Sequence, residues 1–281
     1  MRLGRERNQV GNRTDARPRP TRWAGLLAIR RHQGERKATA QCTCAASTDS
    51  VTSGGEALTE ALEKRFPTEV AILATMFSQS RVAALLPRLN EIHEFAERKW
   101  RDYVARLPEG KIKYLLIAEA PPWSPNGVPQ YVLDPGSYSR TLMRALRKVF
   151  LNPVVAIRVG ADEALAEFAR QGFLIVDSIP FSMDYSGKRS STKYSTLVGR
   201  TARTYLQEKL MSPSLTWSRD LRIAFSIKLN ALAIMKALGH QLTLGETNVV
   251  LGPEMVAVNG AGYPDPAKLR AVYNTHQPSE C

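Results

Sequence analysis

Cysteine is scarce in this sequence of 281 residues, which has three, at Cys42, Cys44 and Cys281. Three cysteines cannot build a disulfide framework, and the single residue between Cys42 and Cys44 is tighter than the usual spacing of a zinc site. We therefore expect a chain that folds without disulfides, metal or cofactor, in a reducing compartment such as the cytoplasm.

Long apolar stretches and several catalytic motifs are also missing. No apolar run approaches the roughly 18 to 20 residues that a membrane-spanning helix needs, so a spanning protein is not expected. The sequence has no Gly-x-Ser-x-Gly elbow, no His-Glu-x-x-His motif and no complete phosphate-loop or dinucleotide-binding glycine pattern. With four histidines, none next to an expected strand end, a histidine-dependent triad is hard to assemble.

The basic charge is concentrated near the start of the chain. Lys and Arg number 39 against 26 Asp and Glu, a net charge of +13. Residues 1–50 hold 11 basic and 4 acidic side chains, which leaves +7 there and +6 over the rest. A basic surface attracts polyanions, so the charge is compatible with DNA as a partner without demonstrating it.

Residues 1–55 show neither the 2-residue nor the 3.6-residue apolar period of strands and helices, and are expected to be a disordered basic extension. An organellar presequence, or translated sequence upstream of the true start, are the alternatives. Residues 56–281 are expected to form a single α/β domain, in which 56–107 is a helical lead-in. Its longest amphipathic helix is expected over 88–107.

The remaining pattern predicts a parallel sheet. Short, continuous apolar runs alternate with amphipathic helices, as in sheets that are covered on both faces. The apolar runs are 113–118, 172–177, 221–227 and 255–258, and the helices are expected over 137–150, 162–171, 196–210, 229–238 and 266–273. We therefore expect a three-layer α/β/α fold with a four-stranded, mainly parallel sheet.

Polar side chains follow the expected strands at their carboxyl ends, where open α/β sheets bind ligands. Asp177 ends the second apolar run, and Glu119, Lys228 and Asn259 come directly after the other three. Two carboxylates, an ammonium group and an amide are therefore expected to converge on one edge of the sheet. Each also has a structural interpretation, as a solvated loop acid, a turn cap, a helix-start lysine and a turn residue respectively.

Two loops flank this edge. The first is stiffened by Pro121 and its neighbours and carries Trp123 and Tyr131, which suits stacking on a planar ligand; the alternative is that both aromatics cover the edge of the core. The second loop, 185–194, mixes hydroxyls and tyrosines with three cations, a combination that suits phosphate contacts but is also typical of a solvated loop. The cations are Lys188, Arg189 and Lys193.

The segment Leu116-Ile-Ala-Glu119-Ala-Pro-Pro122 resembles the first motif of the uracil-DNA glycosylase superfamily. It is most similar to a poorly characterised branch in which a Glu-Ala-Pro-Pro motif leads into an aromatic-bearing loop. The order of strands and helices over residues 110–275 is similar to that of the family core as well.

The resemblance implies that a base is flipped out of the nucleic acid, stacked on an aromatic side chain and recognised at its polar edge. It implies that Glu119 is the carboxylate beside the sugar, and that Trp123 or Tyr131, with Pro121, contacts the base. Asp177 occupies the place where the family often has an asparagine that recognises uracil. Lys188, Arg189, Lys193 and Lys228 are the candidate phosphate-binding residues.

The sequence departs from the family pattern at two places. A carboxylate at Asp177 accepts hydrogen bonds and does not donate them, so a different base preference is expected. The last apolar run ends in Asn259-Gly-Ala-Gly-Tyr263-Pro264 where the family usually has His-Pro-Ser, which leaves Asn259 or Lys228 to stabilise charge on the leaving base. The cysteines that hold an iron–sulfur cluster in some members are missing too.

Three functions are consistent with these residues. The first is a glycosylase-like enzyme in which Glu119 and Asn259 are catalytic and Asp177 recognises the base. The second is a non-catalytic binder of nucleic acid or nucleotide on the same fold. The third is a small-molecule hydrolase that uses Glu119 and Asp177.

Overall fold

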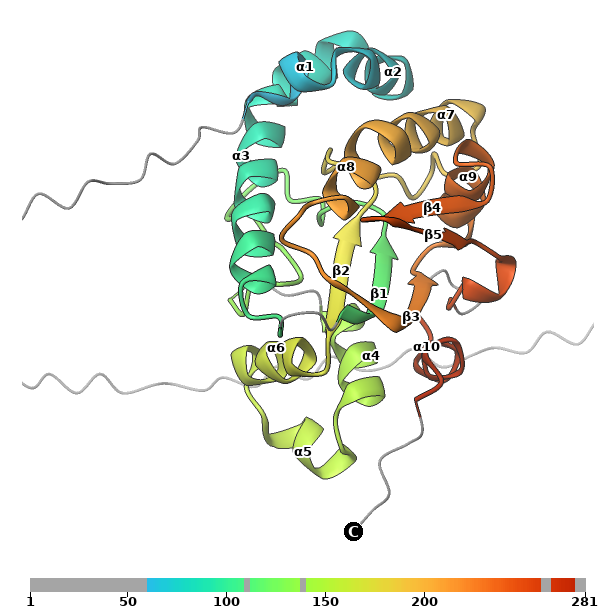
Figure 1. The fold of residues 1–281 in the computed structure, drawn as a ribbon. Coiled ribbons are helices and arrows are strands. Elements are labelled where there is room, and N and C mark those ends of the chain that lie inside the picture. Colours follow the sequence, from blue (N-terminus) through green and yellow to red (C-terminus); the bar gives the residue numbers. More distant parts are fainter. Residues whose placement is uncertain (1–59, 109–111, 137–139, 259–263, 276–281) are drawn as a thin grey trace, which may run out of the picture. The chain divides into compact units, whose positions relative to one another are not determined.

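The structure, a computed structural model, describes residues 60–108, 112–136, 140–258 and 264–275. These residues lie in a unit of the chain that extends from Glu56 to Cys281. They form a mixed α/β fold that contains a three-stranded parallel sheet and a two-stranded antiparallel sheet (Figure 1).

Three helices precede the first strand: α1 (Leu62–Arg65), α2 (Pro67–Phe77) and α3 (Gln79–Val104). The break between α2 and α3 falls at Ser78, where φ is 75° and the side chain accepts a hydrogen bond from the backbone N–H of Arg81 at 3.4 Å. The long helix therefore begins nine residues before the predicted start at 88, and Pro87 lies inside it.

The larger sheet has the strand order β2-β1-β3. The strands are β1 (Ile112–Ala118), β2 (Phe173–Asp177) and β3 (Trp217–Phe225), and all are parallel. The predicted direction of the first three strands is confirmed. Ala118 of β1 is paired with Asp177 of β2, and Ile117 with Phe225 of β3, so the three strands end side by side.

The prediction of a fourth parallel strand is wrong. In the described residues, Val256 makes a single parallel bridge to Phe225, and the N–H of Ala257 donates to the carbonyl of Phe225 at 3.1 Å. The extended segment is short because a 3₁₀ turn, Pro253–Met255, precedes it and because Val258 already turns to an antiparallel bridge with Pro264.

A hairpin that was not predicted follows the helix α9 (Lys228–Ala237). Its strands β4 (Gln241–Leu244) and β5 (Thr247–Val250) are joined at Gly245, whose φ of 57° favours glycine. The alternation of buried Leu242 and Leu244 with polar neighbours is a weak sign of this strand in the sequence.

Two groups of helices surround the sheet (Figure 1). The first consists of α4 (Arg140–Phe150), α5 (Pro153–Arg158), α6 (Ala161–Arg170) and α10 (Pro266–Tyr273); the second consists of α7 (Thr192–Thr201), α8 (Gln207–Leu210) and α9. The predicted helix over 196–210 is thus divided, because a π-helical turn, Ala202–Leu206, connects α7 to α8. Aromatic rings hold the first group against the sheet: Tyr114, Phe150, Phe168, Phe173 and Tyr273.

The helix α3 is held beside β2 by two buried side chains. The indole N–H of Trp100 donates to the carbonyl of Ile175 at 3.2 Å, and the hydroxyl of Tyr103 donates to that of Phe173 at 2.9 Å. These bonds satisfy strand carbonyls at the edge of the sheet, which would otherwise be unpaired. They also fix the position of β2 and hence of Asp177 at its end.

Candidate functional site

A cavity of about 450 Å³ lies at the carboxyl ends of β1 and β2. This volume falls within the range of roughly 300–1,000 Å³ that is usual for ligand pockets. The polar residues that line it are Glu119, Tyr131, Thr141, Asp177, Ser186, Arg189 and Ser226. The structure thus brings together four of the predicted site residues, namely Glu119, Asp177, Tyr131 and Arg189.

The backbone around Glu119 is fixed by the neighbouring strand and by helix α9. The N–H of Ile179 and the hydroxyl of Ser178 both donate to the carbonyl of Glu119, at 2.9 and 3.1 Å. The buried side chain of Asn230 in turn donates to the hydroxyl of Ser178 at 2.9 Å. These hydrogen bonds therefore fix the position of the Glu119 backbone just after the end of β1.

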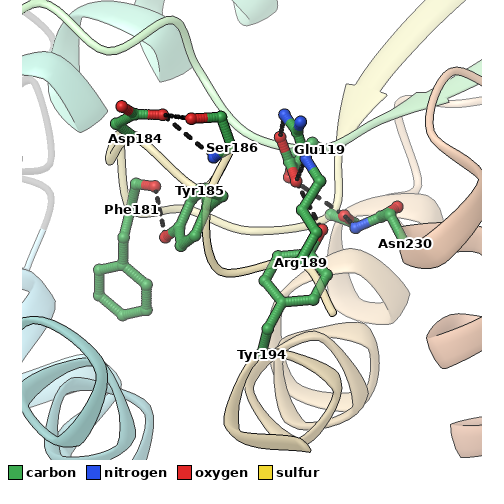
Figure 2. A network of polar contacts seen from close by, with 9 residues as sticks. Glu119, Phe181, Asp184, Tyr185, Ser186, Arg189, Tyr194 and Asn230 are labelled. Carbon is green, nitrogen blue, oxygen red and sulfur yellow. Dashed lines mark hydrogen bonds and ion pairs between the residues drawn. The ribbon is translucent and has the colours of Figure 1, made fainter. Parts of the chain in front are cut away.

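The carboxylate of Glu119 is already engaged (Figure 2). Arg189 donates to both of its oxygens, from Nε at 2.7 Å and from Nη2 at 2.6 Å, and the hydroxyl of Tyr194 donates to Oε1 at 2.6 Å. The side chain of Glu119 is 12% exposed and that of Arg189 is 31% exposed. The hydrogen bonds to Glu119 raise the pKa of Arg189, and burial raises the pKa of Tyr194.

Tyr194 ends the loop 185–194 that the sequence singled out, but neither it nor Ser178 nor Asn230 was predicted as a site residue. Tyr194 is placed by the start of α7, where the side chain of Ser191 caps the helix by accepting from the N–H of Tyr194 at 3.2 Å. A serine three residues before an apolar helical stripe is a recognisable helix-start signal, so this position was accessible to prediction. The contacts of Ser178 and Asn230 depend on residues far apart in the sequence, and no local signal indicates them.

Asp177 lies deeper, at the end of β2, and is fully buried apart from about 3% of its surface. Burial raises its pKa to about 7; Glu97 and Glu119 act in the same direction, whereas Lys209 and a hydrogen bond from Tyr131 oppose the shift. The acid therefore changes its protonation state near neutral pH. When protonated it donates as well as accepts a hydrogen bond, unlike the acceptor-only carboxylate assumed from the sequence.

A buried ion pair, Glu97 with Lys209, belongs to the surroundings of Asp177. Lys209 Nζ lies 2.7 Å from Glu97 Oε1 and 4.3 Å from the centre of the Trp100 ring, and the hydroxyl of Tyr205 donates to the same carboxylate oxygen at 2.7 Å. Burial opposes ionisation of Glu97, but Lys209 keeps its pKa lowered. The pair therefore places two fixed, opposite charges near Asp177.

His93 packs next to this ion pair, and neither of its ring nitrogens has a hydrogen-bond partner among the described residues. Burial lowers its pKa to about 4, so the neutral ring is the form that folds. Because the folded state binds fewer protons than the unfolded state between about pH 4 and 6.5, stability is expected to fall as the pH is lowered through this window.

We expect His93→Leu to raise the free energy of unfolding by about 1–2 kcal/mol at pH 7, because it removes two buried, unpaired nitrogens. The gain is expected to be larger at pH 5, where the histidine of the unfolded chain is protonated. Urea unfolding at the two pH values measures both effects. His240→Asn, at an exposed position with φ of 61°, is the control; a His93 variant that is less stable than the control would show that the ring makes a favourable contact.

The other candidate phosphate-binding residues do not contribute to the cavity wall. The ammonium group of Lys188 lies 5.9 Å from the centre of the Phe77 ring, and that of Lys193 donates to the carbonyl of Thr75 at 2.9 Å. Both therefore contact α2. Lys228 is exposed at the first position of α9.

Of the two aromatic residues in the proline-rich loop, Tyr131 contributes to the cavity and Trp123 does not. Tyr131 is 1% exposed and contributes to the cavity, with a hydrogen bond to Asp177. Trp123 is half-buried and packs against the core, and Pro121 is buried, whereas the neighbouring Pro122 contributes to the wall. The alternative that the aromatics cover the edge of the core thus describes both residues, and Tyr131 contributes to the cavity as well. Asn259 lies outside the described residues.

Within the described residues there is no group of three or more His, Cys, Asp or Glu side chains that could hold a metal ion. In the same part of the chain no helix is both long enough and apolar enough to cross a membrane. The chain matches no protein family, no curated protein and no solved structure.

Proposed function

We propose that the cavity receives a single base of a nucleic acid and that the protein hydrolyses its N-glycosidic bond, as a uracil-DNA glycosylase-like enzyme with an altered base preference. The observation that carries the proposal is the joint position of Glu119 and Asp177 in one cavity of about 450 Å³ at the carboxyl edge of the sheet. A buried acid within the cavity and a carboxylate beside it are what recognition and cleavage of a flipped base require.

In the proposed reaction the base lies against Asp177 and Tyr131, and its sugar lies beside Glu119. As the bond between C1′ and the base nitrogen breaks, its electron pair leaves with the base and positive charge develops on the sugar. The negative charge of Glu119 stabilises that positive charge, and water then adds to C1′, while the proton that the water loses is taken up by the departed base. The products are a free base and an abasic sugar. Of the two residues that the sequence suggests for stabilising charge on the departing base, Lys228 does not contribute to the cavity wall, and Asn259 stays the candidate.

Asp177 gives this site a base preference that depends on pH. Its protonated form donates to a carbonyl, and its ionised form accepts from an amino group. Because its pKa lies near 7, both forms are populated at neutral pH. We therefore expect carbonyl-bearing bases to be favoured at lower pH and amino-bearing bases at higher pH.

A second function, binding of nucleic acid or nucleotide without cleavage, is favoured by the hydrogen bonds that Glu119 already accepts. A carboxylate that holds both donors of Arg189 and the hydroxyl of Tyr194 has part of its charge compensated before any ligand arrives. Such a carboxylate stabilises a cationic sugar less strongly than a free one.

The two functions are separated by measuring binding and base release on the same labelled oligonucleotides. The panel contains uracil, hypoxanthine, xanthine or a deaminated or alkylated base in single- and double-stranded DNA, at pH 6 and 8. Release of a free base from any of them supports the glycosylase; binding without release supports the binder. Absence of both binding and release across the panel would contradict the proposal in either form.

A further inference from the structure

Among the cations of loop 185–194, Arg189 is the one that contributes to the cavity. Its side chain is 31% exposed, and it directs Nε and Nη2 to the two oxygens of Glu119 (Figure 2). This planar, two-donor arrangement fits a phosphate as well as a carboxylate. The same two donors of the guanidinium can therefore bind a phosphate in place of the carboxylate.

The neighbours of Arg189 hold its loop in place, which favours the exchange of the carboxylate for a phosphate. Lys193 is anchored to the backbone of α2 by a hydrogen bond, and the ammonium group of Lys188 packs over Phe77 of the same helix. Thr141 contributes to the same cavity, and so does Ser186, whose N–H and hydroxyl donate to the carboxylate of Asp184 at 3.0 and 2.6 Å. The loop is thus held in place on both sides of Arg189, which is partly exposed.

Glu119 does not become unpaired when the guanidinium leaves. Tyr194, whose pKa is raised by burial and which therefore keeps its proton, still donates to Oε1 at 2.6 Å. The carboxylate of Glu119 then loses its cationic partner, Arg189, and keeps only a neutral one, Tyr194. Its negative charge is therefore no longer compensated by a positive charge. Removal of Arg189 would therefore increase the negative charge that Glu119 presents to the cavity.

We propose that Arg189 is the phosphate receptor of this site, so that the ligand is a nucleotide unit and not a free base or nucleoside. A phosphate of the bound strand takes over both donors of Arg189, and the exchange releases the carboxylate of Glu119 to act on the sugar. The proposal rests on the proposed function, and it explains how a carboxylate paired in the free protein becomes available in the complex.

The test takes the base that the oligonucleotide panel shows to bind most tightly and compares the affinities of its deoxynucleoside, 5′-monophosphate and 3′-monophosphate, measured by calorimetry on the full chain. We expect one of the monophosphates to bind on the order of 10- to 100-fold more tightly than the nucleoside, the range expected of a hydrogen-bonded charge pair. In Arg189→Met this phosphate-dependent gain is expected to disappear, while the affinity for the nucleoside changes by less than about threefold. Arg189→Lys is expected to retain part of the gain.

Arg65→Met is the matched control, because Arg65 is 30% exposed and pairs with Glu208 at 2.7 Å, away from the cavity. This control is expected to keep the full phosphate-dependent gain. If Arg189→Met kept the gain as well, or if the monophosphates bound no better than the nucleoside, Arg189 would be a structural partner of Glu119 and the inference would be wrong. If neither nucleosides, monophosphates nor the oligonucleotide panel bound, the proposed function itself would fail.

Discussion

Glu119→Gln is expected to lower the rate of base release by about 10²- to 10³-fold, the loss usually seen when one preorganised electrostatic group is removed from an active site. Glutamine keeps the size of the side chain and an oxygen that accepts from Tyr194, but it carries no negative charge to offset that of the sugar. Affinity for the oligonucleotide is expected to change much less, because the charge matters chiefly when the glycosidic bond breaks. Single-turnover release of the base, measured beside equilibrium binding, separates the two effects.

The control for this variant is Glu69→Gln. Glu69 is also a buried carboxylate with an arginine and a hydroxyl as partners, Arg200 at 3.5 Å and Thr204 at 3.2 Å, but it lies on α2. A similar loss of thermal stability in both variants, with a loss of base release in Glu119→Gln only, assigns the chemistry to Glu119. Undiminished release in Glu119→Gln would remove this residue from the mechanism.

Asp177→Asn is expected to stabilise the protein at alkaline pH. The pKa of Asp177 is raised by burial from 3.8 to about 7, so the folded state binds more protons than the unfolded state between these values. The free energy of unfolding therefore falls as the pH rises through this window, by about 4 kcal/mol in total, at about 1.4 kcal/mol for each pKa unit. Asparagine does not ionise, so the variant avoids this loss.

We expect Asp177→Asn to be more stable than the unsubstituted protein by an amount on the order of 4 kcal/mol at pH 8, and nearly equal to it at pH 4. Urea unfolding at pH 4, 6 and 8 measures the difference, from which the contribution of His93 cancels. Asp102→Asn, at an exposed position on α3, is expected to show no such trend. A variant that is less stable at pH 8 would mean that Lys209 keeps Asp177 ionised in the folded protein.

Most of the sheet could be predicted because a buried parallel strand needs a continuous apolar run. Residues 113–118 and 172–177 have that composition, and they correspond to β1 and β2. The first half of β3, from Trp217 to Asp220, was missed because none of its residues is fully buried and three of the four are polar. The run at 255–258 was apolar as well, but composition alone does not reveal how many ladder bonds a four-residue segment forms between two turns.

The site was predicted in part for a similar reason. The rule that ligands bind beyond the carboxyl ends of parallel strands identified Glu119 and Asp177 without a motif, since position in the chain fixes the strand end. The rule does not show which side chains form hydrogen bonds or ion pairs with these two acids. The sequence could not distinguish between the three cations of loop 185–194 as ligands of the site. In the structure Lys188 and Lys193 contact α2, and of these three only Arg189 contributes to the cavity.

By itself the sequence determined the alternation of strands and helices and the edge at which polar side chains collect, because both follow from local periodicity and chain order. Only the tertiary structure decided the state of those side chains. The pairing of Glu119 with Arg189 and Tyr194 joins residues 70 and 75 positions apart, and the raised pKa of Asp177 arises from burial by many distant elements. Charge compensation and desolvation depend on three-dimensional surroundings, which local sequence does not specify.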